Sequence, residues 1–316
     1  MDDAREDAAI LDAVRAGPKA GDEKHAQPEH ITFAATDGFP LTGTWFAGDG
    51  DGPAILVSAA TAVPRGYYTR FAQALVQSGA AGVLSYDYRG LPGSPSPKGW
   101  RAPLLMRHWA LHDFPAALDE LEQRAGTTHL AGIGQSFGGQ ALGLSGTAHR
   151  FARYANVAAL SGYWRNTATP LRVLLSMNAV GVPMTWAFGR TFRAMGIGEP
   201  LPGPVFREWA RWCRTPDYFM SDPSLPETAR FADVTTPVLS VRHDDDPWGT
   251  EKAVEALLGF YPNAPVTRLV LGPAQAGEPV GHLGFFRSRF AETLWPPVVD
   301  WLLRSEAPAA SFRQNG

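Results

Sequence analysis

The chain has 316 residues, a formal net charge of −3, 45% hydrophobic residues and 19% charged residues. These values are typical of a globular protein with a large apolar core. Because no long basic run is present, the composition predicts neither nucleic-acid binding nor attachment to an anionic membrane by charge, and favours small neutral or mildly polar partners. The single cysteine, Cys213, has no partner for an internal disulfide and is expected to be a buried structural thiol.

The two ends of the chain are expected to lie outside the folded core. Residues 1–29 combine Asp, Glu, Lys, Gly and Pro with one short helical pattern, which predicts a mobile leader, and residues 305–316 form a C-terminal tail. The first residues are acidic where a secretory signal is basic, so we expect a cytoplasmic protein. The longest apolar stretch, 171–188, is interrupted by polar residues, glycine and proline. We therefore expect no membrane span and assign it to the fold or to a lid.

Taken in order, the predicted elements begin with two strands, 31–35 and 41–46, that flank an Asp-Gly turn and form an antiparallel pair. Buried strands then alternate with helices. We expect further strands at 53–58, 81–86, 130–133, 157–160, 237–242 and 266–271, helices at 67–78, 111–124, 137–145 and 250–258, and a closing helix that is interrupted by Pro296 and Pro297 and ends near 303. This alternation predicts an α/β fold with a mostly parallel eight-stranded sheet flanked by helices.

The alternation breaks after the sixth strand, where aromatic residues accumulate. We expect residues 162–230 to form a helical cap inserted after strand 6, while residues 30–161 and 231–304 form the core. Ligands of such sheets bind beyond the carboxyl ends of the strands. Most cap aromatics are expected to pack against the sheet, and some to line the substrate pocket.

A Gly-Gln-Ser-Phe-Gly sequence, centred on Ser136, follows the predicted strand 130–133 and precedes a helix. A serine on such a turn, with glycine two positions to either side, is typical of a nucleophile elbow. In a chain with 33 glycines the motif can also arise by chance. The positions of other reactive groups must therefore support it.

Those groups follow later strands. A serine nucleophile needs an imidazole to take its proton and a carboxylate to orient that imidazole. Asp246 follows strand 237–242 and His282 follows the last strand, which predicts Ser136 as nucleophile, His282 as base and Asp246 as orienting acid. Asp245 is the alternative acid. The adjacent carboxylates beside His243 could also suggest a metal site, although such a turn more often caps a helix and faces water.

The oxyanion formed during acyl transfer needs two backbone donors. We predict the N–H of Phe137, the residue after the nucleophile, and an N–H from the loop after strand 53–58, with Ala60 as the favoured residue. Arg89, in a Gly- and Pro-rich loop, is expected to tie loops together in preference to binding substrate.

With these residues the chain resembles the α/β-hydrolase superfamily over 31–303, and within it a group of bacterial predicted α/β-hydrolases of largely unassigned substrate. Five motifs carry the resemblance: Tyr86-Asp87-Tyr88-Arg89-Gly90, Gly134-Gln135-Ser136-Phe137-Gly138-Gly139, Glu208-Trp209-Ala210-Arg211-Trp212-Cys213, Asp245-Asp246-Pro247-Trp248 and Gly281-His282-Leu283-Gly284-Phe285-Phe286. The resemblance implies a serine hydrolase with an acyl-enzyme intermediate, no metal and no organic cofactor. Many relatives have His at the position of Gln135 and Gly at the position of Ala59, so altered selectivity is expected before lost activity.

The sequence therefore predicts a carboxylic-ester hydrolase of the serine esterase type that acts on a small apolar or aromatic ester. Nucleic acid is not an expected partner, and a homodimer is left open. Two alternatives remain at this point. One is acyl transfer by the same three residues, and the other is a non-catalytic, ligand-binding relative.

Overall fold

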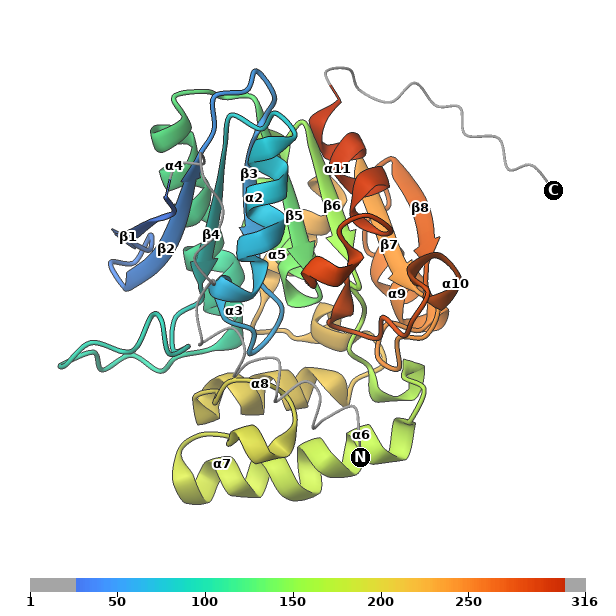
Figure 1. The fold of residues 1–316 in the computed structure, drawn as a ribbon. Helices are drawn as coiled ribbons and strands as arrows, with labels where there is room; N and C mark the ends of the chain where they lie inside the picture. Colours follow the sequence, from blue (N-terminus) through green and yellow to red (C-terminus); the bar gives the residue numbers. More distant parts are fainter. Residues whose placement is uncertain (1–26, 305–316) are drawn as a thin grey trace.

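The computed structural model describes residues 27–304, and its centre is one eight-stranded sheet in the order β1-β2-β4-β3-β5-β6-β7-β8 (Figure 1). The strands are β1 Glu29–Ala34, β2 Pro40–Ala47, β3 Ala54–Ser58, β4 Gly82–Asp87, β5 Leu130–Gln135, β6 Arg153–Val157, β7 Val238–His243 and β8 Val266–Leu271. Strand β2 is antiparallel to both β1 and β4, and the remaining pairs are parallel. The predicted α/β fold is confirmed. The predicted leader, apart from its last three residues, and the predicted tail lie outside the described residues.

Helices cover both faces of the sheet. In Figure 1, α2 and α11 lie in front of it, and α4, α5 and α9 lie behind. Their bounds are α2 Thr69–Gln77, α4 Phe114–Ala125, α5 Phe137–Ser145, α9 Glu251–Leu258 and α11 Trp295–Leu303. Strands β3 to β6 are buried along their whole length, which explains why β3 and β5 begin as continuous rather than alternating apolar runs.

Two predicted boundaries were wrong. The sixth strand is Arg153–Val157 and not 157–160, because the apolar run begins where the strand ends and Ala158 turns to φ 48°. The polar Arg153 is tolerated inside this buried strand because its guanidinium donates to the Trp301 carbonyl at 2.8 Å. The second error concerns Pro296 and Pro297, which stand in the first turn of α11 and begin the helix instead of interrupting it. Proline loses no helical hydrogen bond there.

Arg89 joins three segments of the core, as expected. Its fully buried guanidinium binds both carboxylate oxygens of Asp37, at 2.7 and 2.8 Å, and Oδ1 of Asp113, at 2.7 Å from Nε. Burial opposes the charge of Arg89, but these bonds outweigh it and raise the pKa. The β1–β2 turn, the loop after β4 and the start of α4 are thus held together by this one side chain.

A helical insertion between β6 and β7 contains the predicted cap and lies across the carboxyl ends of the parallel strands (Figure 1). Its main helices are α6 Pro170–Leu175, a π-helical turn Ser176–Gly181, α7 Val182–Phe188 and α8 Gly203–Cys213. Among the described helices, the continuous 19-residue helix Pro170–Phe188 has the length and composition of a membrane span. Its α7 portion packs on α8, so here it is an element of the cap.

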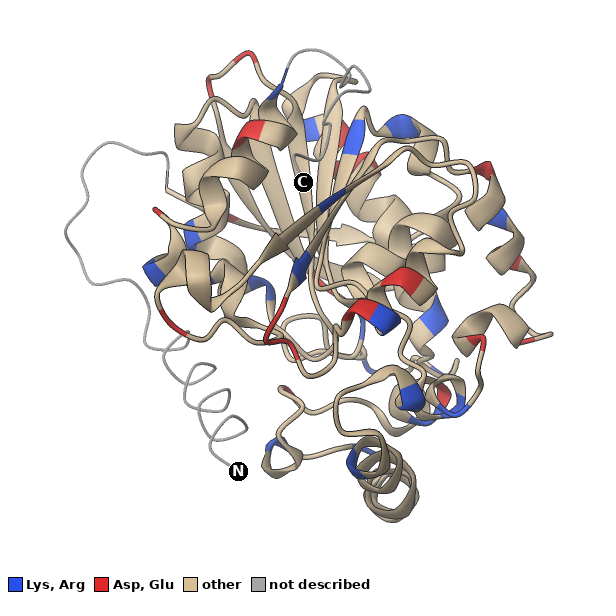
Figure 2. Ribbon diagram, turned by 90° about the vertical axis from the view of Figure 1, so that its right-hand side faces the viewer, with Lys and Arg blue, Asp and Glu red and all other residues tan. Residues whose placement is uncertain are grey.

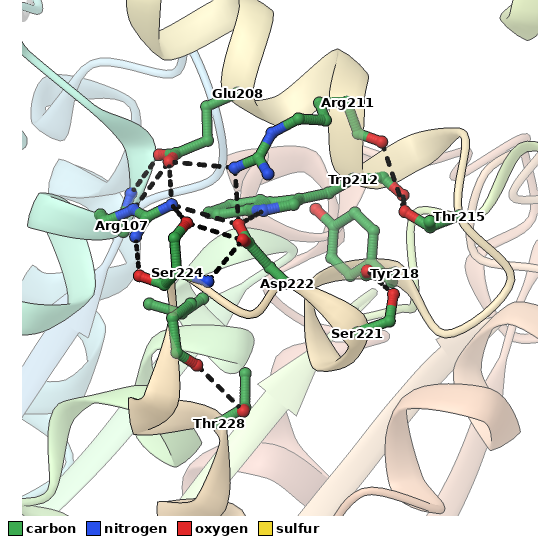
Figure 3. A network of polar contacts seen from close by, with 11 residues as sticks. Arg107, Glu208, Arg211, Trp212, Thr215, Tyr218, Ser221, Asp222, Ser224 and Thr228 are labelled. Atoms are coloured by element: carbon green, nitrogen blue, oxygen red, sulfur yellow. Dashed lines mark hydrogen bonds and ion pairs between the residues drawn. The ribbon is translucent and has the colours of Figure 1, made fainter.

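A polar network ties this cap to the core (Figure 3). Arg107, in the short helix α3 Met106–His108 between β4 and α4, donates from its backbone and its Nε to the Glu208 carboxylate of α8, at 3.0 and 2.7 Å. It also pairs with Asp222 at 3.1 Å. Burial raises the pKa of Asp222, but bonds from Arg211 and the Trp212 indole outweigh it and keep this pKa far below its usual value.

Cys213 is the last residue of α8 and comes directly after Trp212, a member of this network. It is almost fully buried, and burial raises the pKa of its thiol well above the usual value. Both observations are those of a structural thiol.

Candidate active site

The turn between β5 and α5 places Ser136 at φ 50° and ψ −112°. A non-glycine residue adopts this conformation only when its surroundings enforce it. A Cβ on Gly134 would overlap the backbone of Gly138, and a Cβ on Gly138 would overlap the Ser58 carbonyl. The close passage of strand, turn and helix therefore requires both glycines of the motif, as a nucleophile elbow does.

The structure brings the three predicted reactive side chains together. His282 Nε2 lies 3.2 Å from Ser136 Oγ, and His282 Nδ1 lies 2.7 Å from Asp246 Oδ2. With a proton on Nδ1 directed to the carboxylate, Nε2 is left to accept the serine proton. Ser136 and Asp246 are buried, while the His282 side chain keeps 19% of its surface exposed.

Asp246 remains a carboxylate in this setting. Burial raises its pKa, but the facing His282 and the backbone N–H groups of Trp248 and Gly249 outweigh burial, and the net pKa is lowered. The Trp248 N–H donates to Oδ1 at 2.8 Å. One oxygen is thus held by the backbone and the other by the imidazole.

Asp245, the alternative acid, does not contact the imidazole. It accepts the backbone N–H groups of Val280 and Gly281, at 2.7 and 3.1 Å, and so holds the loop that carries His282. His243 is buried, with Nδ1 2.9 Å from the Gly281 carbonyl on the same loop. Within residues 27–304, no group of three or more His, Cys, Asp or Glu side chains is placed to hold a metal ion.

The loop after β3 differs from the prediction. The Ala60 N–H donates to the Tyr68 hydroxyl at 2.9 Å, so it is engaged inside the protein and not free to meet an oxyanion. The next amide, that of Thr61, has no hydrogen-bond acceptor in the described part of the chain. The Phe137 N–H is the first of α5, where helical amides lack an acceptor within the helix. The candidate donors are therefore Phe137 and Thr61, and the assignment to Ala60 is corrected.

Gln135, the residue before the serine, links the two loops of the site. Its Oε1 accepts from the Tyr68 hydroxyl at 2.7 Å, and its Nε2 donates to the His282 carbonyl at 3.1 Å. A continuous chain of hydrogen bonds thus runs from the Ala60 amide to the backbone of the histidine. This role of Gln135 could not be predicted from the sequence, because its partner Tyr68 lies in no recognisable motif.

The cap reaches the site through an aromatic pair. Trp209 of α8 stacks on Trp248 with ring centroids 6.1 Å apart and an angle of 24° between planes. The Trp248 ring lies in turn 6.5 Å from the His282 ring. Both indoles are only partly buried. The cap also touches the loop after β3, since the Glu199 N–H donates to the Ala62 carbonyl at 2.8 Å.

Comparison with known proteins was made for both sequence and fold. The sequence profile described as "Alpha/beta hydrolase family" matches residues 54–303. No curated protein matches the chain by sequence.

Solved structures with a similar fold include an esterase of Pyrococcus furiosus, Pf2001 (14% identity, TM-score 0.55, 90% of this chain and 96% of the other). An esterase of Exiguobacterium antarcticum has 14% identity and a TM-score of 0.57, covering 87% and 99% of the two chains. A hydrolase from Pseudomonas aeruginosa has 16% identity and a TM-score of 0.54, covering 87% and 98%. At these identities the likeness concerns the fold.

Proposed function

Because the chain belongs to the alpha/beta hydrolase family, we propose that it is a serine hydrolase that cleaves carboxylic esters through an acyl-enzyme intermediate. The observation that carries this proposal is the hydrogen-bonded series from Ser136 through His282 to Asp246, with distances of 3.2 and 2.7 Å. Esterases among proteins of the same fold are consistent with it. The fold alone would not distinguish ester cleavage from other chemistry.

The proposed reaction has two halves. In the first, Ser136 Oγ attacks the ester carbonyl carbon while His282 Nε2 takes the hydroxyl proton. The negative charge that forms on the carbonyl oxygen is stabilised by the N–H groups of Phe137 and Thr61. The C–O bond to the alcohol then breaks, the alcohol leaves with the proton from His282, and the acyl group remains on Ser136.

In the second half, His282 removes a proton from water, and the resulting hydroxide attacks the acyl carbon. Collapse of the second tetrahedral intermediate breaks the bond to Ser136, whose oxygen recovers the proton from His282. Asp246 stays ionised throughout and stabilises the imidazolium that forms twice in each cycle. Its lowered pKa supports this role.

The substrate class follows from what lies beside the imidazole. The Trp209–Trp248 pair offers a partly exposed aromatic surface next to His282. Such a surface favours an acyl or alcohol group that is apolar or aromatic, because burying it against indole rings removes apolar area from water. We therefore propose small apolar or aromatic esters as substrates.

The test combines turnover with labelling of the nucleophile. The protein should hydrolyse p-nitrophenyl butyrate and react with a fluorophosphonate probe, which requires an activated serine. Ser136→Ala should lose both, with turnover falling at least about a thousandfold. Ser161→Ala is the matched control, since Ser161 is also buried and its hydroxyl has no partner among the described residues. Turnover that persists in Ser136→Ala would refute the proposal, and product analysis with an added alcohol would reveal acyl transfer.

A further inference from the structure

The long helix of the cap presents an apolar face to solvent. Within residues 27–304, six large hydrophobic side chains are markedly exposed, and five of them belong to this helix. They are Leu171 (67% exposed), Leu175 (58%), Val180 (52%), Trp186 (72%) and Phe188 (66%). Single exposed hydrophobic residues are common on proteins, but five on one helix form a patch that calls for a partner.

The opposite face of the helix is anchored, so the apolar face is held outward. Val173, Met177, Gly181 and Thr185 recur every four residues and are buried. A Cβ on Gly181 would overlap the Phe206 ring of α8, which shows how closely the two helices approach. On this anchored helix, the exposed residues cannot turn inward without detaching it from α8.

The charged side chains on this stretch of the chain are all arginines. Residues 162–198 contain four arginines and no aspartate, glutamate or lysine. Arg165, Arg172 and Arg190 are exposed and form no ion pair with any described residue. They lie before, at the start of and just after the helix. In Figure 2, where the helix is seen nearly end on at the bottom of the molecule, its ribbon carries blue and no red. The local charge is thus opposite to the net charge of −3.

From this combination we infer that the outer face of helix Pro170–Phe188 docks on an anionic lipid surface. Helices that lie in the membrane interface bury Leu, Trp and Phe at the level of the head groups while Arg or Lys contact anionic lipids. The long helix offers both, with arginines at its two ends. The sequence-wide composition predicted no such attachment because the net charge is negative, whereas the attraction here comes from one face.

The charges and the packing disfavour the two other uses of an apolar helix. A two-fold contact between copies of this face would bring arginines against arginines, and residues 162–198 supply no carboxylate to pair with them. A spanning helix would place Arg172 toward hydrocarbon and would strip the buried face from α8. Docking on the surface keeps the cap intact and leaves the arginines at the head groups.

Sedimentation of the full chain with phospholipid vesicles tests the inference, and it requires no ester turnover. Vesicles of phosphatidylcholine with about one third phosphatidylserine should bind the protein at least about tenfold better than phosphatidylcholine alone. The double variant Leu175→Glu/Val180→Glu should reduce binding at least about tenfold, and Arg172→Ala/Arg190→Ala should remove most of the preference for phosphatidylserine. Val270→Glu is the control, because Val270 is exposed (46%) but lies on β8.

Circular dichroism should show that all variants are folded, as expected for exposed positions. The inference is overturned if the wild-type chain does not sediment with anionic vesicles, or if Val270→Glu weakens binding as much as the helix variants do. A dimer in vesicle-free solution that Leu175→Glu/Val180→Glu dissociates, together with no vesicle binding, would assign the face to a second copy and would also overturn it.

Discussion

Tyr68→Phe probes the hydrogen bonds that join the two loops of the candidate site. The hydroxyl that this substitution removes accepts the Ala60 N–H at 2.9 Å and donates to Gln135 Oε1 at 2.7 Å. All three residues are buried. The variant leaves one donor and one acceptor unpaired, each costing about 1–3 kcal/mol, and partial relaxation brings the expected loss to about 2–4 kcal/mol of unfolding free energy.

The matched control is Tyr88→Phe. Tyr88 is equally buried, but its hydroxyl approaches only the Tyr86 side chain and makes no hydrogen bond of regular geometry within the described chain. Removing it should change the unfolding free energy by less than about 1 kcal/mol, or stabilise the protein. Urea denaturation followed by tryptophan fluorescence measures both variants. Equal effects of the two substitutions would show that the hydroxyl of Tyr68 contributes nothing beyond its volume and would refute the reasoning.

Three further predictions concern the acid, the pH dependence and the cap. Asp246→Asn should lower kcat for p-nitrophenyl butyrate about 10²–10⁴-fold. Asp245→Asn should lower kcat far less, because Asp245 does not contact the imidazole. Comparable losses in the two variants would contradict the assignment of Asp246 as the orienting acid. Burial lowers the pKa of His108 to about 4 from about 6.5 in the unfolded chain. The unfolded chain therefore binds this proton first, so the contribution of His108 to stability is complete above pH 6.5 and declines as the pH falls toward 4. Denaturation at pH 7.5 and 5 should show a smaller difference for His108→Gln. Arg107→Met should cost about 3–5 kcal/mol because it leaves the buried Glu208 carboxylate without its main partner, and a melting temperature unchanged from wild type would rule this out.

The fold and the three reactive side chains could be predicted because their signals are local. A strand that is covered on both faces has a continuous apolar sequence. A nucleophile elbow needs glycines at fixed positions around the serine. Asp246 and His282 each follow a strand, so strand order places them beyond the carboxyl ends of the sheet. The preference for Asp246 over Asp245 rested on the spacing from strand 237–242, and Asp246 is the carboxylate that meets the imidazole.

The errors arose where a contact between distant segments decides the outcome. Nothing in the sequence around Ala60 indicates that the Tyr68 hydroxyl, eight residues further along the chain, accepts a hydrogen bond from its amide. The polar Arg153 inside β6 donates a hydrogen bond to the carbonyl of Trp301, a residue far along the chain that the strand sequence does not indicate. The exposure of the outer face of the cap helix could not be predicted either, because an apolar stretch does not show which of its residues will be buried in contacts with other segments.

The position of the cap in the chain has a consequence for how such proteins diversify. Strands β6 and β7 are parallel neighbours, so any connection between them must return from the carboxyl end of β6 to the amino end of β7. The cap enlarges the first part of this crossover. The last part, Pro226–Asp233, returns along α5, where the Phe231 ring packs against Gly143. Replacing the enlarged half would change what lies over the candidate site. A replacement would also have to supply the partners that Glu208 and Trp209 give to Arg107 and Trp248 in the core.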